Sequence, residues 1–197
     1  MIFSKSKWSD MNEIAAQVVV VGSGAAGISL ALELESLGRT VIILEAGEES
    51  YSQESQELYS GDSIGTPLPY GLTGSRLRFF GGSTNCWGGG CGELDDVDFL
   101  QRDWVDNSGW PISRDDLTFW YKKATRFLRL SYPSSVPLKF TPNFKAISGM
   151  HTRCLSATPI LRFNQEFKGR IELSDKITLL TGANCTNISY SSKSGSV

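Results

Sequence analysis

Three glycines near the amino end have the spacing that a bound diphosphate requires. Gly22, Gly24 and Gly27 form the pattern Gly-x-Gly-x-x-Gly directly after the apolar run Val18–Val21, and a helix-forming segment begins at Ala25. In this pattern the first glycine permits a tight turn, the second lets backbone approach a pyrophosphate, and the third lets helix and strand pack closely. The N–H groups at the start of the helix, at the positive end of its dipole, would then hold phosphate anions.

A carboxylate follows the glycines at the distance typical of a ribose contact. The segment Thr40–Leu44 reads as a second buried strand, and Glu45 ends it. A carboxylate in this place accepts hydrogen bonds from a ribose diol and repels a 2′-phosphate, which disfavours NADP. Strand, glycine turn, helix over residues 25–37, second strand and acid follow one another in order. The sequence therefore favours a dinucleotide-binding βαβ unit over a plain structural one.

Composition and charge narrow the class of protein. The 197 residues are 40% hydrophobic and 20% charged, which is typical of a soluble globular protein with one substantial core. The net charge of −2 provides no basic face, so nucleic acid is not an expected partner. No apolar run reaches the roughly 20 residues that span a bilayer, and the start of the chain lacks a secretory pattern. We expect a cytoplasmic protein without a membrane segment, in which residues 1–16 form a loose polar leader.

The cysteines show no spacing that indicates a structural role. Cys86, Cys91, Cys154 and Cys185 include no Cys-x-x-Cys pair, so the sequence indicates neither a disulfide framework nor a zinc site. The first three could in principle form a metal cluster with His151, but their spacing is not that of ordinary zinc ligands. We therefore expect no metal.

The middle of the chain carries a long polar excursion and then an amphipathic helix. Residues 47–75 are polar and punctuated by Gly and Pro, and connections of this length are usually functional or mobile. Ser113, with Asp116 three residues later, marks the start of a capped helix. Apolar residues recur along this helix at helical spacing and are expected to pack on a core. They are Leu117, Trp120, Tyr121, Ala124, Phe127 and Leu128.

The carboxyl end predicts an unfinished sheet. Lys176–Leu180 and Cys185–Tyr190 read as strands, and Ser191–Gly195 reads as a hairpin turn with no returning strand after it. Two short parallel strands and one late hairpin do not complete a doubly wound α/β sheet. We expect the chain to be a fragment.

A second glycine cluster and a later motif carry a resemblance to a known family. The segments 22–47, 81–89 (GGSTNCWGG) and 108–113 (SGWPIS) together resemble, in the same order, the glucose-methanol-choline (GMC) oxidoreductase family. The resemblance covers most of residues 17–130 and, more faintly, 171–190. It implies an α/β, Rossmann-like FAD-binding fold, in which additional strands extend the βαβ unit, incomplete at the carboxyl terminus.

The resemblance also implies a domain plan and an activity. Residues 17–197 would form a truncated FAD-binding domain, with residues 111–165 open as the start of a substrate or cap region. The parent protein would oxidise the CH–OH groups of an alcohol, sugar or polyol by hydride transfer to FAD, with an electron acceptor that the sequence does not define. The chain alone would be inactive. The alternatives are a non-catalytic FAD-binding module and an NAD-dependent dehydrogenase, which would leave the glycines of residues 81–92 unexplained.

The family's cofactor-binding residues carry over onto two glycine turns and a late segment. Two consecutive glycines followed by two hydroxyls allow close backbone approach and supply short donors to a phosphate or ring edge. A late backbone segment, here 183–185, contacts the adenine in the family. The cofactor-binding residues are therefore expected to be Gly22, Ser23, Gly24, Ala25, Ala26, Gly27, Glu45, Ala46, Gly81, Gly82, Ser83, Thr84, Cys86, Trp87 and Cys185.

Four side chains beside the second turn have open interpretations. Cys86 stands where several family members carry a flavin-linked histidine, which excludes histidyl attachment and favours a free thiol over a cysteinyl linkage. Trp87 either plugs the core or shapes the ring site. Arg76 and Arg78 either contact phosphate or are solvated charges on a loop.

No catalytic residue can be assigned. Alcohol oxidation needs a base to accept the hydroxyl proton, and the family uses a histidine near the end of a much longer chain. The one histidine here, His151, lies well before any such position and reads as a surface or structural residue.

Overall fold

The computed structural model describes residues 1–130, 156, 157, 159 and 161–190. The chain divides into two compact units, one of Met1–Trp87 with Leu161–Val197 and the other of Gly88–Ile160. The substrate or cap region expected to start within residues 111–165 stays a prediction.

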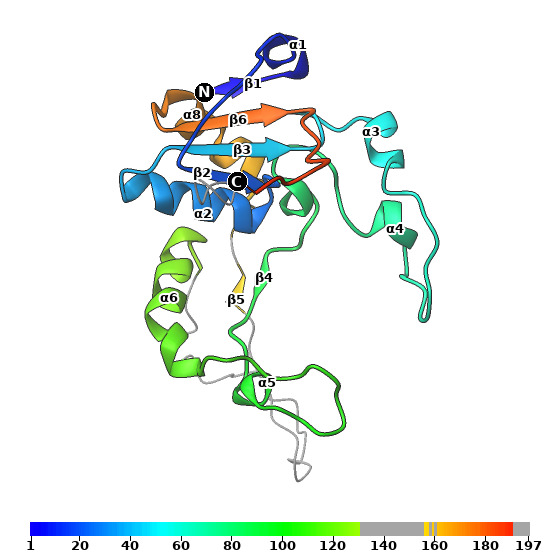
Figure 1. Cartoon of the computed structure of the whole chain (residues 1–197). Coiled ribbons are helices and arrows are strands. Elements are labelled where there is room, and N and C mark those ends of the chain that lie inside the picture. Colours follow the sequence, from blue (N-terminus) through cyan, green and yellow to red (C-terminus); the bar gives the residue numbers. More distant parts are fainter. Residues whose placement is uncertain (131–155, 158, 160, 191–197) are drawn as a thin grey trace. The chain divides into compact units, whose positions relative to one another are not determined.

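A four-stranded parallel sheet organises the first unit. Its strands are β1 (Ile2–Phe3), β6 (Ile177–Thr181), β3 (Val41–Glu45) and β2 (Val18–Val21), in that spatial order (Figure 1). Every neighbouring pair is parallel, with Leu44 of β3 level with its partners in β2 and β6. The carboxyl ends of β2, β3 and β6 thus meet along one edge of the sheet.

The βαβ unit that the sequence predicts is present. Helix α2 (Ala25–Ser36) connects β2 to β3 and buries Ile28, Ala31 and Leu32. Consecutive residues of β3 are buried because the strand is internal and covered on both faces, which explains its unbroken apolar sequence. This arrangement is consistent with the expected Rossmann-like α/β fold.

The start of the chain joins the sheet, so residues 1–16 are not a loose leader throughout. β1 pairs with β6, and α1 (Lys5–Trp8) follows it directly. The Trp8 indole donates a 2.8 Å hydrogen bond to the Thr181 carbonyl and packs against Ile42 and Leu180. Ile2, Phe3 and Trp8 thus attach this segment to the first unit.

The buried side-chain amide of Gln56 holds together the polar excursion of residues 47–75. The segment contains α3 (Gln53–Glu57) and α4 (Gly71–Gly74). The Gln56 side chain donates to the carbonyls of Thr73 and Arg76 at 2.6 and 2.7 Å, and accepts from the Arg78 N–H at 2.9 Å. Both ends of the stretch between α3 and Arg78 are therefore fixed to one side chain.

The chain returns to the first unit after the second one. Short helices α7 (Phe163–Glu166) and α8 (Lys168–Leu173) lead into β6, and they bury Phe163, Phe167 and Ile171. The expected strand Cys185–Tyr190 is wrong, because residues 184–190 are exposed and have no strand partner in the described chain. The hairpin turn expected at 191–195 lies outside the described residues.

The second unit contains β4 (Gly90–Cys91) paired antiparallel with β5 (Ser156–Ala157), and the helices α5 (Asp96–Phe99) and α6 (Arg114–Phe127). The predicted capping box of α6 is confirmed, since Ser113 and Asp116 bond to each other's backbone N–H. The prediction of a core-packed stripe is wrong for Trp120, which is 52% exposed, and for Ala124, which is exposed. The described part of this unit has only short elements, which offer no apolar face wide enough to cover the helix.

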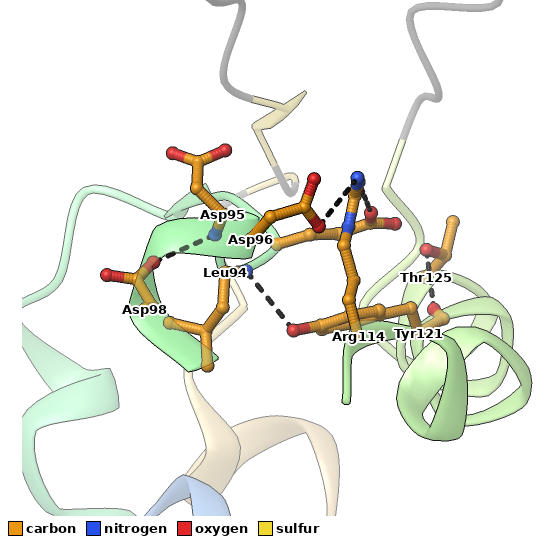
Figure 2. A network of polar contacts seen from close by, with 8 residues as sticks. Leu94, Asp95, Asp96, Asp98, Arg114, Tyr121 and Thr125 are labelled. Carbon is orange, nitrogen blue, oxygen red and sulfur yellow. Dashed lines mark hydrogen bonds and ion pairs between the residues drawn. The ribbon is translucent and has the colours of Figure 1, made fainter. Parts of the chain in front are cut away.

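Polar contacts hold α5 to α6 instead. Arg114 pairs with Glu93 at 2.9 Å and with Asp96 at 3.8 Å, and the Tyr121 hydroxyl accepts from the Leu94 N–H at 3.1 Å (Figure 2). A polar cavity of about 500 Å³ is lined here by the acids Glu93, Asp96 and Asp115, by the cations Arg114 and Lys122, and by Thr118 and Tyr121. Arg114 pairs with two of these acids, Glu93 and Asp96, so part of its charge is used within the cavity wall.

Candidate functional site

The first glycine turn has the geometry that its spacing predicts. Gly22 has a φ of +97°, a conformation that favours glycine, and a Cβ on Gly27 would lie 1.9 Å from the Gly22 carbonyl oxygen. A Cβ on Gly24, in contrast, would meet no atom within 4 Å. A side chain is thus disfavoured at Gly22 by its backbone conformation and at Gly27 by a clash, whereas Gly24 has open space beside it.

The helix that follows begins without a cap. Gly24 is the N-cap residue of α2, no side chain accepts from the first turn, and the first turn holds no acid. The N–H groups at this end are therefore available to an anion, which the positive end of the helix dipole also favours.

A second glycine turn lies directly against the first. The Gly81 N–H donates to the Ser23 carbonyl at 3.1 Å, and a Cβ on Gly82 would lie 3.2 Å from the Gly24 Cα. Gly81 and Gly82 have φ values of +90° and +54°, so the backbone enters the 3₁₀ turn η1 (Gly82–Asn85) through left-handed conformations. Two glycine-rich segments far apart in the sequence thus meet at the carboxyl ends of the strands.

Glu45 has a structural role that the motif does not reveal. Its carboxylate is 6% exposed, and one oxygen accepts from both the N–H and the hydroxyl of Ser23, at 3.0 and 2.6 Å. The other oxygen accepts from the Gly47 N–H at 2.8 Å. Since an ionised carboxylate offers about four acceptor sites, one remains for a ribose hydroxyl.

These elements enclose a cavity of about 330 Å³ at the carboxyl edge of the sheet. Its lining includes residues that the sequence predicts and others that it does not. The predicted ones are Gly22, Gly24, Glu45, Ala46, Gly82, Ser83 and Cys185. The lining also includes Ala183, from the segment expected at the adenine, and Arg76, for which phosphate contact was one of two interpretations. No motif indicates its remaining members, which are Val21, Leu44, Tyr59 and Leu77.

Other predicted residues lie outside this lining. Ser23 and Thr84 are buried and spend their hydroxyls on Glu45 and on the Gly81 carbonyl. Cys86 is exposed, with its thiol 3.4 Å from the Ser83 carbonyl. Ala25, Ala26 and Gly27 form the first turn of α2, and Gly81 supports the second glycine turn. Their contacts with a cofactor stay a prediction.

Trp87 packs inside the first unit. Its ring meets Phe163 edge to face at 6.0 Å, and its indole N–H donates to the Leu161 carbonyl at 2.8 Å. These contacts favour the interpretation of Trp87 as a plug of the core.

The second turn is held by a clamp that no sequence motif indicates. Arg162 donates to the carbonyls of Thr84 and Trp87 at 2.9 and 3.1 Å, and the Phe163 N–H donates to the Thr84 hydroxyl at 3.2 Å. The returning segment therefore holds the second turn at Thr84 and at Trp87. Its residues follow no motif, so only the fold reveals this contact.

Arg78 matches neither interpretation offered for it. It is buried and donates to Ser55 and to the Asn184 side chain, so it is neither a solvated charge nor part of the cavity lining. It links the excursion to the segment that follows β6.

Two further features concern metal binding and membrane insertion. Within the described ranges, no group of three or more His, Cys, Asp or Glu residues could hold a metal ion, and His151 and Cys154 lie outside those ranges. No helix in the part of the chain that was described is long and apolar enough to cross a membrane.

Comparison with known proteins identifies the kind of ligand. Residues 17–60, which include β2, α2 and β3, match the family model of an FAD binding domain. No curated protein matches the chain. The match supports FAD as the cofactor and a flavin-dependent oxidoreductase type of module. The uncapped helix start, the open space at Gly24 and the second glycine turn fit such a dinucleotide.

Proposed function

We propose that this chain is the FAD-binding part of an oxidoreductase of the GMC type, which acts on CH–OH groups of alcohols, sugars or polyols. The contact between the turns of Gly24 and Gly82, beside the uncapped start of α2, carries the proposal. When bound, FAD supplies the acceptor for a hydride from the carbinol carbon.

Each part of the cavity has a role toward the cofactor. The N–H groups that begin α2 bind the diphosphate, and Gly24 allows it to approach the backbone. The remaining acceptor site of Glu45 takes a ribose hydroxyl. Ala183 and Cys185 form the wall against the adenine, and Ser83 faces the diphosphate or the flavin.

The second turn favours FAD over NAD. Gly82 and Ser83 line the same cavity as the first glycine turn, and the NAD alternative gives them no role. The family match to an FAD binding domain supports the same choice.

The donor class rests on the resemblance of segments 81–89 and 108–113 to the GMC family. The base that would accept the hydroxyl proton is not assigned, because His151 is the one histidine of the chain and lies outside the described residues. We therefore expect the chain alone to bind FAD without oxidising an alcohol.

Titration of the purified chain with FAD, followed by flavin fluorescence, tests the proposal. Gly24→Ala places a methyl group where the diphosphate approaches, and should weaken FAD binding about tenfold or more without lowering the Tm. Gly169→Ala is the matched control, because its Cβ also meets nothing within 4 Å but lies in α8. Absence of FAD binding by the wild-type chain would contradict the proposal.

Two further measurements test the finer points. Alcohol-dependent reduction of a dye by the FAD-loaded chain would contradict the assignment of this chain to cofactor binding alone. Yellow colour that survives acid precipitation, and is lost in Cys86→Ser, would show a cysteinyl flavin in place of the free thiol that we expect.

A further inference from the structure

The polar excursion brings an aromatic ring and a cation to the wall of the cavity. Tyr59 follows α3, and the guanidinium carbon of Arg76 lies 4.5 Å from the centre of its ring. Both residues line the cavity of about 330 Å³ that also contains Gly24 and Gly82. Neither belongs to a glycine turn, and Arg76 lies beyond the residues that match the FAD binding domain.

The two neighbouring arginines differ in what their donors bind. Arg78, whose guanidinium carbon is 5.8 Å from the same ring, is 6% exposed and donates to Ser55 and Asn184. The Arg76 side chain is exposed and, among the described residues, makes contact only with the Tyr59 ring. Because a guanidinium carries five N–H donors, Arg76 has its donors available to a ligand.

The backbone at Arg76 is already fixed. Its carbonyl accepts from the buried Gln56 amide at 2.7 Å, and the next N–H, that of Leu77, donates to the Ser83 hydroxyl at 3.1 Å. The second of these contacts joins the segment to the second glycine turn. Only the side chain of Arg76 has to be ordered on binding, and stacking on Tyr59 reduces that cost.

The side chains that line the cavity include one cation. Neither glycine turn carries a charged side chain, and Arg76 is the one cationic side chain among the described residues that line the cavity. The start of α2 contributes about half an elementary charge, whereas the diphosphate of a dinucleotide carries about two negative charges. A full positive charge at the wall supplies what the backbone dipoles leave uncompensated.

We propose that Arg76 binds the diphosphate of the bound FAD and that Tyr59 holds its guanidinium at the cavity wall. This inference rests on the proposed function, since it takes the cavity as the FAD site. It adds a side-chain contact from a segment that lies outside both glycine motifs.

The test compares FAD, ADP and adenosine on the full chain. Flavin fluorescence measures the Kd of FAD, and displacement of FAD measures the affinities of ADP and adenosine. Arg76→Met should weaken FAD and ADP about tenfold to a hundredfold and leave adenosine unchanged, because only the first two carry a diphosphate. The dependence of the FAD affinity on ionic strength should also become less steep.

A matched variant separates this contact from a general loss of charge. Arg39→Met removes an exposed cation that precedes β3, at the opposite end of the strand from Glu45, and should change none of the three affinities. Tyr59→Phe keeps the ring and should bind FAD as the wild type does. Tyr59→Leu removes it and should weaken FAD about two- to fivefold.

The outcomes distinguish this inference from the function on which it rests. Unchanged FAD affinity and salt dependence in Arg76→Met would overturn the role of Arg76 and leave the FAD site standing. An equal loss for adenosine and ADP would also overturn it, because the effect would not lie at the diphosphate. Failure of the wild-type chain to bind either FAD or ADP would overturn the proposed function and this inference with it.

Discussion

The Glu45 carboxylate holds the Ser23 residue at both its N–H and its hydroxyl, and so joins the end of β3 to the first glycine turn. Ser23 in turn accepts from Gly81, which begins the second turn. One acid therefore orders both walls of the proposed FAD site before any ribose reaches it.

Replacement of Ser23 tests this connection. Ser23→Ala removes the 2.6 Å bond to a buried carboxylate and should lower the free energy of unfolding by about 1.5–3 kcal/mol. Urea unfolding followed by circular dichroism measures the change. Ser36→Ala, at the exposed end of α2, should stay within about 0.5 kcal/mol of the wild type. Equal effects of the two substitutions would contradict the structural role of Glu45.

The third glycine of the motif should tolerate no side chain. Gly27→Ala would place a Cβ 1.9 Å from the Gly22 oxygen, so helix and turn must separate, at a cost of about 1–3 kcal/mol or more. The Tm of the chain without FAD measures this cost. Gly38 cannot serve as the control, because its φ of +79° is itself unfavourable to alanine. Gly169→Ala serves instead, and a normal Tm for Gly27→Ala would refute the predicted clash.

The amino-terminal segment should contribute to stability. Trp8→Phe keeps most of the packing against Leu180 and loses the hydrogen bond to Thr181, for an expected loss of about 0.5–1.5 kcal/mol. Chemical unfolding compares it with Trp104→Phe, in a tryptophan that is 80% exposed and should show little effect. If Trp8→Phe behaves like Trp104→Phe, the segment is the loose leader that its composition suggested.

The capping box of α6 should respond to acid. Hydrogen bonds from the backbone N–H and hydroxyl of Ser113 lower the pKa of Asp116 below its ordinary value. A pKa that is lower in the folded state adds stability above the unfolded value of about 3.9, and this contribution disappears as the pH falls through the folded pKa. An NMR titration of the Asp116 carboxyl should give a midpoint below about 3.9. In Ser113→Ala the midpoint should rise, and an unchanged midpoint would count against the box.

Local chemistry determined how much the sequence could predict. The glycine turn, α2 and β3 depend on residues that are close in sequence. The sequence predicted the bounds of α2 and β3 to within one residue. β1 was missed because two apolar residues carry no periodic signal and their partner is near the other end of the described chain. The expected strand at 185–190 has suitable residues, but the described part of the chain provides no neighbour with which it could pair.

The candidate site shows the same division. The residues of the two glycine turns and Glu45 were predicted from their motifs, and the structure brings several of them to one cavity. Tyr59 and the Arg162 clamp were missed, because each acts through a contact between distant segments that no local pattern encodes. Trp120 is an example of a wrong prediction. Helical periodicity identified an apolar face of α6, but it does not tell whether another element covers that face, and Trp120 is exposed.

Attachment of the polar excursion through Gln56 has a practical consequence for protein engineering. Residues 60–71 are exposed throughout, while the backbone on either side of them is secured by that one amide. Gly65 lies within this stretch in a left-handed conformation, and a Cβ built on it would meet nothing within 4 Å. A peptide tag or a fluorescent reporter inserted after Gly65 would therefore lie at the protein surface. We expect such an insertion to leave the proposed cofactor cavity unchanged.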